Sequence, residues 1–313
     1  MRGFYRAFPF ALALMCAAAA RAESAPIPHG TLELVPENPW IAAQSILTPG
    51  VATGRMAGGH TFNVGLRFQL EKGWHIYWIN PGDSGEPARV EWKLPAGLTA
   101  GPIEWPTPRR LASGSIVDYG YEGAVLLIVP LHADASLASQ SAARLGAEIR
   151  LLVCSHEMCI PAKAALSLTV PVKAQAPVPD ATTVAWFAAA RKSMPRPPSQ
   201  NWRFNATEDE DFFVLTAELG HPITQTVFFP LVESQIENAA PQTLVPRASG
   251  FRLTLRKSNQ LLASVARLKG VLVVSGDRTP GDGTNQDRAY VIDVPVRKAG
   301  ATKHLEDGDR SVK

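Results

Sequence analysis

The sequence predicts an all-β fold of two immunoglobulin-like β-sandwich domains, the second carrying one helix. Short segments with alternating apolar and polar residues recur along most of the chain, separated by Gly, Pro, Asn and Asp. The length of 313 residues is enough for about two domains of ordinary size. With 46% hydrophobic and 19% charged residues, each domain can bury a core, which excludes a disordered chain.

The first 22 residues have the order of a secretory signal peptide. Two arginines precede an apolar stretch over residues 8–20, and an Ala-Arg-Ala sequence ends at Ala22, where we expect cleavage. Met15 stands before Cys16 where a lipoprotein signal has a small residue, so Cys16 is interpreted as part of the removed peptide. No later apolar run approaches the roughly 18 residues of a spanning helix, so the sequence predicts an exported, soluble periplasmic protein without membrane insertion.

The first predicted domain covers residues 23–172. Its clearest strands are TFNVGLRFQL (61–70), RVEWKL (89–94), GAVLLIVPLHA (123–133), AEIRLLV (147–153) and ALSLTVPV (165–172). In the first, second and last of these, apolar residues alternate with polar ones, as in strands with one buried face. Short strands with turn residues between them favour an antiparallel sandwich.

A Pro- and Ala-rich linker is expected at residues 173–182. It is followed by a predicted helix over residues 183–194, with Thr182 or Thr183 as N-cap and Pro195 as a stop. Strand-like text then resumes, and residues 183–297 form the second predicted domain. Residues 298–313 are polar and are expected to be a disordered tail.

The net charge of +3 is scattered along the chain, which excludes the basic footprint of a nucleic-acid-binding protein. The two cysteines of the mature chain, Cys154 and Cys159, lie at the mouth of a predicted hairpin with four residues between them. Facing residues of an antiparallel pair are about 4.5–5.5 Å apart at Cα, within the range that a disulfide requires. In an oxidising compartment this pair is disulfide-capable.

Three interpretations of the pair remain open. A structural disulfide that closes so small a loop contributes only about 2 kcal/mol to stability. A Cu(I) site would use the soft ligands Cys154, His156, Met158 and Cys159. A redox pair needs exposed, bridgeable thiols; His156 is placed to tune a thiolate, and Pro161 stiffens the exit of the turn.

Three ordered motifs resemble the amino-terminal periplasmic domain of DsbD-type thiol:disulfide interchange proteins, and most of all their ScsB branch, which is linked with suppression of copper sensitivity. These motifs are EKGWHIYWINPGDSGEP (71–87), YGYEG (119–123) and CSHEMCIP (154–161). The likeness covers roughly residues 36–172. Residues 183–296 resemble the second periplasmic domain of that branch more weakly, through WFAAAR, FFP and AAPQ.

The resemblance implies a disulfide-carrying sandwich, with no other cofactor, that exchanges electrons with periplasmic thioredoxin-fold partners. Cys159 would form the mixed disulfide with the partner, and Cys154 would resolve it. The aromatic stretch at residues 74–78 would place His75 and Tyr77 beside the cysteines as supporting residues. Its side chains are also suited to the core of a strand. A cap loop is expected between Trp105 and Tyr119.

Two departures from the family are visible. The cysteines have one residue fewer between them than in its best-known members, and the sequence has neither the membrane-spanning nor the thioredoxin-like domain that delivers electrons. We therefore expect a component of a protein-disulfide reductase that depends on a separately encoded membrane electron donor. A copper-binding or non-redox interaction role is the alternative.

Overall fold

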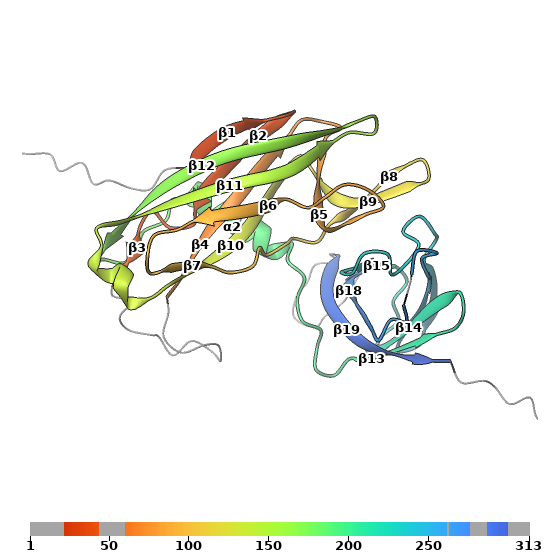
Figure 1. Cartoon of the computed structure of the whole chain (residues 1–313). Coiled ribbons are helices and arrows are strands. Elements are labelled where there is room, and N and C mark those ends of the chain that lie inside the picture. The colour runs from red at the N-terminus through yellow and green to blue at the C-terminus, as the bar shows by residue number, and fades with distance from the viewer. Residues whose placement is uncertain (1–21, 44–59, 262, 276–286, 300–313) are drawn as a thin grey trace, which may run out of the picture.

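The computed structural model describes residues 22–43, 60–261, 263–275 and 287–299. It confirms the predicted fold class, because nearly all regular structure is β and the sheets form two sandwich-like units (Figure 1). The predicted signal peptide and the predicted tail fall almost entirely outside the described residues. Strand β1 (Glu23–Ile27) begins at the residue after the expected cleavage point.

The first sandwich packs two antiparallel-rich sheets face to face. One sheet has the order β1, β2 (Gly30–Pro36), β4 (His60–Leu70), β10 (Ala124–Ala133) and β7 (Leu98–Ala100). The other has the order β3 (Ile41–Ala42), β12 (Cys159–Lys173), β11 (Ala142–Cys154), β5 (His75–Gly82), β9 (Ile116–Glu122) and β8 (Arg109–Ser113), while β6 (Arg89–Lys93) pairs with β11. A short 3-10 helix, Ala135–Ser139, joins β10 to β11.

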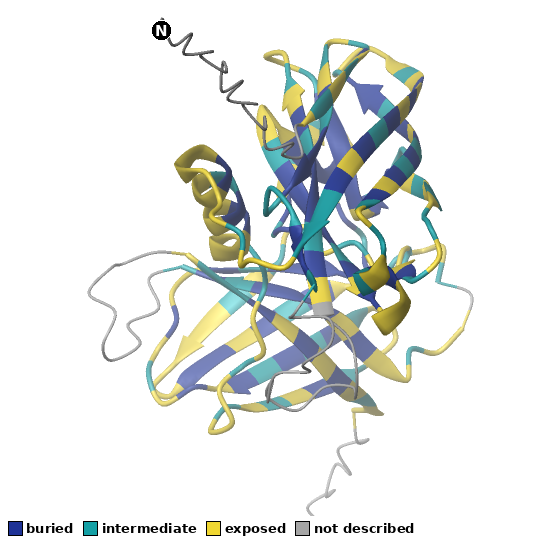
Figure 2. Cartoon of the chain, turned by 90° about the vertical axis from the view of Figure 1, so that its left-hand side faces the viewer, coloured by how far each residue is buried: buried dark blue, intermediate teal, exposed yellow. Residues whose placement is uncertain are grey.

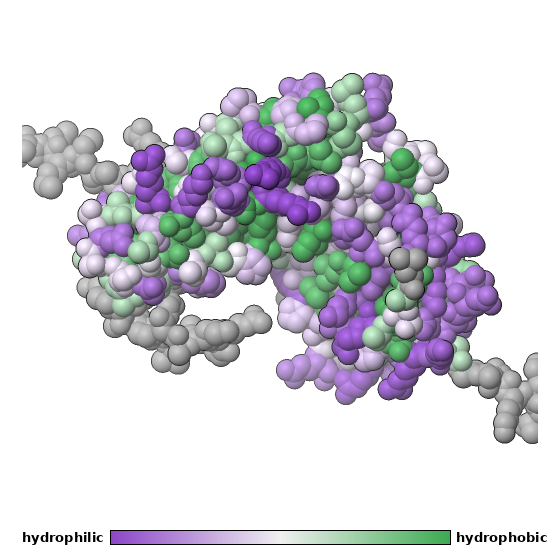
Figure 3. All heavy atoms as spheres, in the orientation of Figure 1, coloured by the Kyte–Doolittle hydropathy of each residue, from purple (hydrophilic) through white to green (hydrophobic). Residues whose placement is uncertain are grey.

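Alternation along the strands builds the core of this sandwich. Buried and exposed residues alternate along many of the strands (Figure 2). In β4 the residues Phe62, Val64, Leu66 and Phe68 are buried, as the sequence predicts. Leu145, Ile149 and Val153 of β11 complete the opposite layer. The outer face over β6 and β11 is hydrophilic, because Arg89, Glu91, Lys93, Glu148 and Arg150 all point to solvent there (Figure 3).

The second sandwich is one seven-stranded sheet that bends around its own core. Its order is β15 (Thr226–Pro230), β18 (Arg267–Val274), β19 (Arg288–Lys298), β13 (Arg203–Glu208), β14 (Phe212–Glu218), β17 (Gly250–Arg256) and β16 (Thr243–Arg247). Strands β18 and β19 curve strongly (Figure 1). The enclosed core includes Phe213, Phe228 and Phe251, all fully buried.

Helix α2 (Ala181–Lys192) differs in two ways from what the sequence predicts. Its N-cap is Asp180, whose carboxylate accepts a hydrogen bond from the Thr183 backbone N–H at 2.9 Å, in place of either threonine. The sequence assigns the helix to the second domain, but it packs on the outer face of β10 in the first sandwich. Phe187 is fully buried there in a small cluster with Val35 and Ile128.

The two sandwiches meet in a packed join rather than through the linker alone. Phe229 and Val271 of the second sandwich belong to the core cluster of the first. The Phe229 ring lies edge-on to Trp78 and Tyr119, with centroids 6.3 and 5.2 Å away. The buried Asn80 side chain donates a hydrogen bond to the Pro230 carbonyl at 2.8 Å.

Candidate functional site

The cysteine pair closes the hairpin of β11 and β12. Cys154 is the last residue of β11 and Cys159 the first of β12, and the two are direct cross-strand partners. They form a disulfide with their Cα atoms 4.1 Å apart, slightly closer than the roughly 4.5–5.5 Å expected for facing residues. The two sulfurs therefore meet within a single hairpin, as predicted, and no distant part of the chain is needed to bring them together.

Ser155 organises the turn between the cysteines. Its backbone N–H donates to the Met158 carbonyl at 2.8 Å. Its hydroxyl oxygen accepts from the backbone N–H groups of Glu157 and Met158 at 3.2 and 3.3 Å. His156, Glu157 and Met158 are all exposed. The turn thus has a fixed backbone and presents its side chains to solvent.

The two sulfur-bearing residues differ sharply in exposure. Cys154 is fully buried, whereas Cys159 is an exposed residue. Thiol–disulfide exchange requires a thiolate to reach a sulfur directly. Of the two residues, Cys159 is therefore the one that an incoming thiolate is expected to reach.

His75 is the cross-strand neighbour of the buried cysteine. Strand β5 pairs with the end of β11 through Cys154 and His75. The imidazole is buried, lies edge-on to Tyr77 with centroids 5.1 Å apart, and its Nε2 has no hydrogen-bond partner in the described part of the chain. Burial lowers the pKa of His75, and the nearby His156 lowers it further, against an opposing effect of Glu122.

Tyr77 contacts the exposed cysteine. Its side chain is 1% exposed, and its hydroxyl lies 3.5 Å from the Cys159 sulfur. Burial raises the pKa of the Tyr77 phenol, so the hydroxyl keeps its proton at neutral pH. In the disulfide the sulfur carries no hydrogen, and the phenol is the donor.

The rest of the aromatic stretch lies apart from the disulfide. Trp78 is part of the sandwich core, and Trp74 stacks on His29 with ring centroids 3.7 Å apart. Pro161 is exposed on β12 and faces Leu152 in the register. Of the supporting residues predicted from the sequence, the structure therefore brings His75 and Tyr77 to the cysteines, while His156 stands in the turn.

Sequence reasoning missed the residues that hold Tyr77. Gly85 lies over its ring, since a Cβ at that position would be 2.1 Å from the Tyr77 Cζ atom. The Ser84 backbone N–H and hydroxyl both donate to the Asp118 carboxylate at 3.0 Å. Ser84 and Gly85 stand in NPGDSG, which reads as an ordinary turn, and Asp118 directly precedes YGYEG. The only signal was the presence of both segments among the family motifs.

The predicted cap region forms the β8–β9 hairpin. It contacts the second sandwich, because the Arg110 guanidinium donates to the Asn238 carbonyl at 2.5 Å. The segment in contact with Tyr77 is residues 82–87 instead. Tyr77 and Pro87 form an isolated β-bridge.

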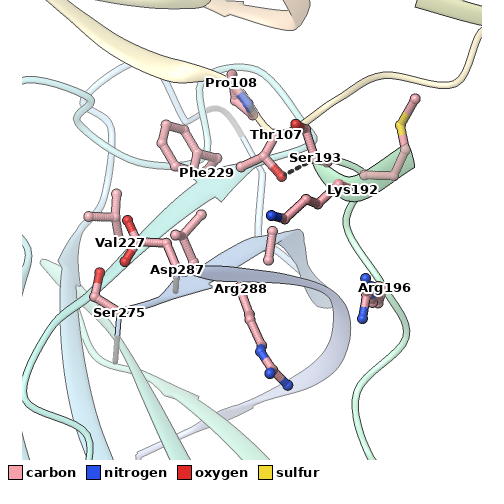
Figure 4. Close-up of a pocket in the computed structure, with 13 residues that line it drawn as sticks. Thr107, Pro108, Lys192, Ser193, Arg196, Val227, Phe229, Ser275, Asp287 and Arg288 are labelled. Carbon is pink, nitrogen blue, oxygen red and sulfur yellow. Dashed lines mark hydrogen bonds between the residues drawn. The ribbon is translucent and has the colours of Figure 1, made fainter. Parts of the chain in front are cut away.

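Three other features of the described chain bear on its chemistry. No three His, Cys, Asp or Glu side chains among the described residues are grouped to hold a metal ion. A hollow of about 470 Å³ lies where the sandwiches meet, near Thr107, Ser193 and Phe229 (Figure 4). Its described lining contains neither cysteine. No helix in the described ranges is long and apolar enough to cross a membrane.

Comparisons with known proteins found one matching family and a similar solved structure. Residues 43–171 match the family model described as "Thiol:disulfide interchange protein DsbD, N-terminal". The structure resembles the crystal structure of the N-terminal periplasmic domain of ScsB from Proteus mirabilis, with a TM-score of 0.57 and 15% sequence identity. That match covers 89% of this chain and 99% of the other. No curated protein sequence matches the chain.

The two comparisons cover different shares of the chain. The first sandwich, with its hairpin disulfide, is similar over residues 43–171 to the amino-terminal domain of DsbD-type thiol:disulfide interchange proteins. Over 89% of its length, the chain has the fold of the ScsB N-terminal periplasmic domain. The resemblance predicted from three sequence motifs is confirmed.

Proposed function

We propose that this chain is a periplasmic thiol-disulfide exchange protein that passes electrons through the Cys154/Cys159 pair to or from thioredoxin-fold partners. Cys159 forms the bond to the partner, and Cys154 resolves it. The membership of residues 43–171 in the DsbD N-terminal family and the ScsB-like fold support the class of activity and the periplasmic location. We further propose a membrane protein as the electron donor of the pair.

The observation that carries this proposal is the difference in exposure between the two cysteines. A partner thiolate attacks the sulfur of Cys159, the exposed residue of the pair, so that a new S–S bond forms and Cys154 leaves as a thiolate. In the reverse step the Cys154 thiolate attacks Cys159, restores the internal disulfide and releases the partner thiolate. Because the two cysteines are cross-strand neighbours, the resolving sulfur is already in place.

Trapping of the mixed disulfide tests the assignment. Cys154→Ala is expected to accumulate a reductant-sensitive covalent adduct with an exported thioredoxin-fold protein, because the resolving thiol is missing. Cys159→Ala should trap little, since Cys154 is buried. Equilibration of the wild type with glutathione should give a reduction potential above about −300 mV. A potential well below that value, together with no adduct from Cys154→Ala, identifies a structural disulfide.

A further inference from the structure

Residues 82–87 connect the second sandwich to the redox pair. On one side of this segment, Gly85 packs against the Tyr77 ring, and the Tyr77 hydroxyl lies 3.5 Å from the Cys159 sulfur. Gly85 has a φ of +80°, a conformation that favours glycine, so the close approach depends on the absence of a side chain. The position of the Tyr77 phenol therefore depends on where this segment lies.

Two acidic side chains anchor the segment to β9. Asp83 forms a reciprocal pair with Val117, in which the Asp83 N–H donates at 3.1 Å and its carboxylate accepts at 2.7 Å. Asp118 accepts two hydrogen bonds from Ser84 at 3.0 Å. These contacts hold the segment to the first sandwich. They use one oxygen of the Asp83 carboxylate, and the other oxygen faces the second sandwich.

The second sandwich supplies the partner for that oxygen. The Asn238 side-chain amide donates to it at 2.8 Å, and the Asn238 amide oxygen accepts from the Tyr119 hydroxyl at 2.9 Å. Asn238 is 5% exposed, so loss of its side chain would leave buried polar groups without partners. At the start of the segment, Asn80 adds a second tether by its bonds to Gly82 and to Pro230 of the second sandwich.

We propose that Asn238 is a positioning residue for the redox pair: it holds residues 82–87 so that the Tyr77 hydroxyl stays in contact with the Cys159 sulfur. This inference rests on the proposed redox function and gives the second sandwich a role in it. In the reduced protein the phenol donates to the Cys159 thiolate. A hydrogen bond to a charged group is stronger than one between neutral groups, so this contact favours the reactive thiolate.

The reaction of the reduced full-length protein with oxidised glutathione measures this effect. In that step the Cys159 thiolate forms an S–S bond to one glutathione, and the other glutathione leaves as a thiolate. Tyr77→Phe is expected to slow the step several-fold at neutral pH, and Asn238→Ala to slow it in the same direction. The double variant should react no more slowly than Tyr77→Phe, because both changes remove the same contact.

Asn205→Ala is the matched control, because Asn205 is an exposed asparagine of the same sandwich. Gly85→Ala approaches the contact from the other side: it leaves Asn238 in place, displaces the Tyr77 ring, and should slow the reaction as Tyr77→Phe does. If Asn238→Ala fails to fold, this variant and Tyr77→Phe decide the matter. A folded Asn238→Ala or Gly85→Ala with the wild-type rate overturns the proposal, as does a double variant whose two effects multiply. No protein partner takes part, so the result is independent of the trapping experiment.

Discussion

His75, the cross-strand neighbour of Cys154, makes the stability of the fold depend on pH. The folded protein keeps His75 neutral to a lower pH than the unfolded chain does, because burial lowers its pKa from the ordinary value of 6.5. Between about pH 6.5 and the lowered pKa of the folded state, the unfolded state therefore binds more protons, and the free energy of unfolding falls as the pH falls. A single group contributes at most about 1.4 kcal/mol per pH unit.

His75→Gln should flatten this dependence. The glutamine carries no charge at any pH, so the difference in proton binding disappears, and denaturant titrations at several pH values below 6.5 measure the change in slope. His132→Gln is the matched control, since His132 is an exposed histidine of β10. If the free energy of unfolding depends on pH equally in the wild type and in His75→Gln, then His75 binds protons equally in the folded and unfolded states, which contradicts the prediction.

The hairpin is the element that the sequence defines best. Its strands alternate regularly, its turn has four residues, and these local features fix both the register and the facing cysteines. The supporting residues are less predictable because their roles depend on contacts between distant segments. Gly85 and Asp118 act on Tyr77 only through tertiary packing, which a turn-like motif does not reveal.

The affinity of the same hairpin for Cu(I) distinguishes redox exchange from copper binding. We expect reduced protein to bind Cu(I) weakly, with no change in the variant His156→Ala/Met158→Ala. Met158 is 55% exposed and His156 is exposed, whereas Cys154 is fully buried, so a shared Cu(I) site would require side chains in different environments to converge. Competition titration with a Cu(I) chelator measures the affinity. Tight binding that the double substitution abolishes would favour the copper alternative.

At the scale of the whole molecule, helix α2 follows the linker in sequence but belongs to the first sandwich in space. Sequence reasoning located the helix from its alanines, its basic end and Pro195, but local pattern carries no information on which sheet it covers. The Arg191 guanidinium binds the Glu37 carboxylate at 2.5 and 2.8 Å, and Arg67 lies 4.1 Å from the Trp186 ring centroid. These contacts attach the helix to Glu37, the residue that follows β2, and to β4.

The boundary between the domains, predicted at residues 173–182, is therefore best tested with two fragments. A fragment of residues 23–194 should unfold cooperatively, because it keeps α2 on its own sheet. A fragment of residues 23–175 loses the burial of Phe187 and should be less stable by about 3–5 kcal/mol, the usual cost of truncating a core phenylalanine. Urea titration followed by circular dichroism gives both free energies.

Phe187→Ala in the full-length chain is the matched control, because it removes the same side chain without shortening the protein. It should lose a similar free energy. Equal stability of the two fragments would show that helix docking contributes nothing to the first sandwich. If neither fragment unfolds cooperatively, the buried contacts of Phe229 and Val271 make the two sandwiches a single folding unit, and the predicted boundary separates no independent domain.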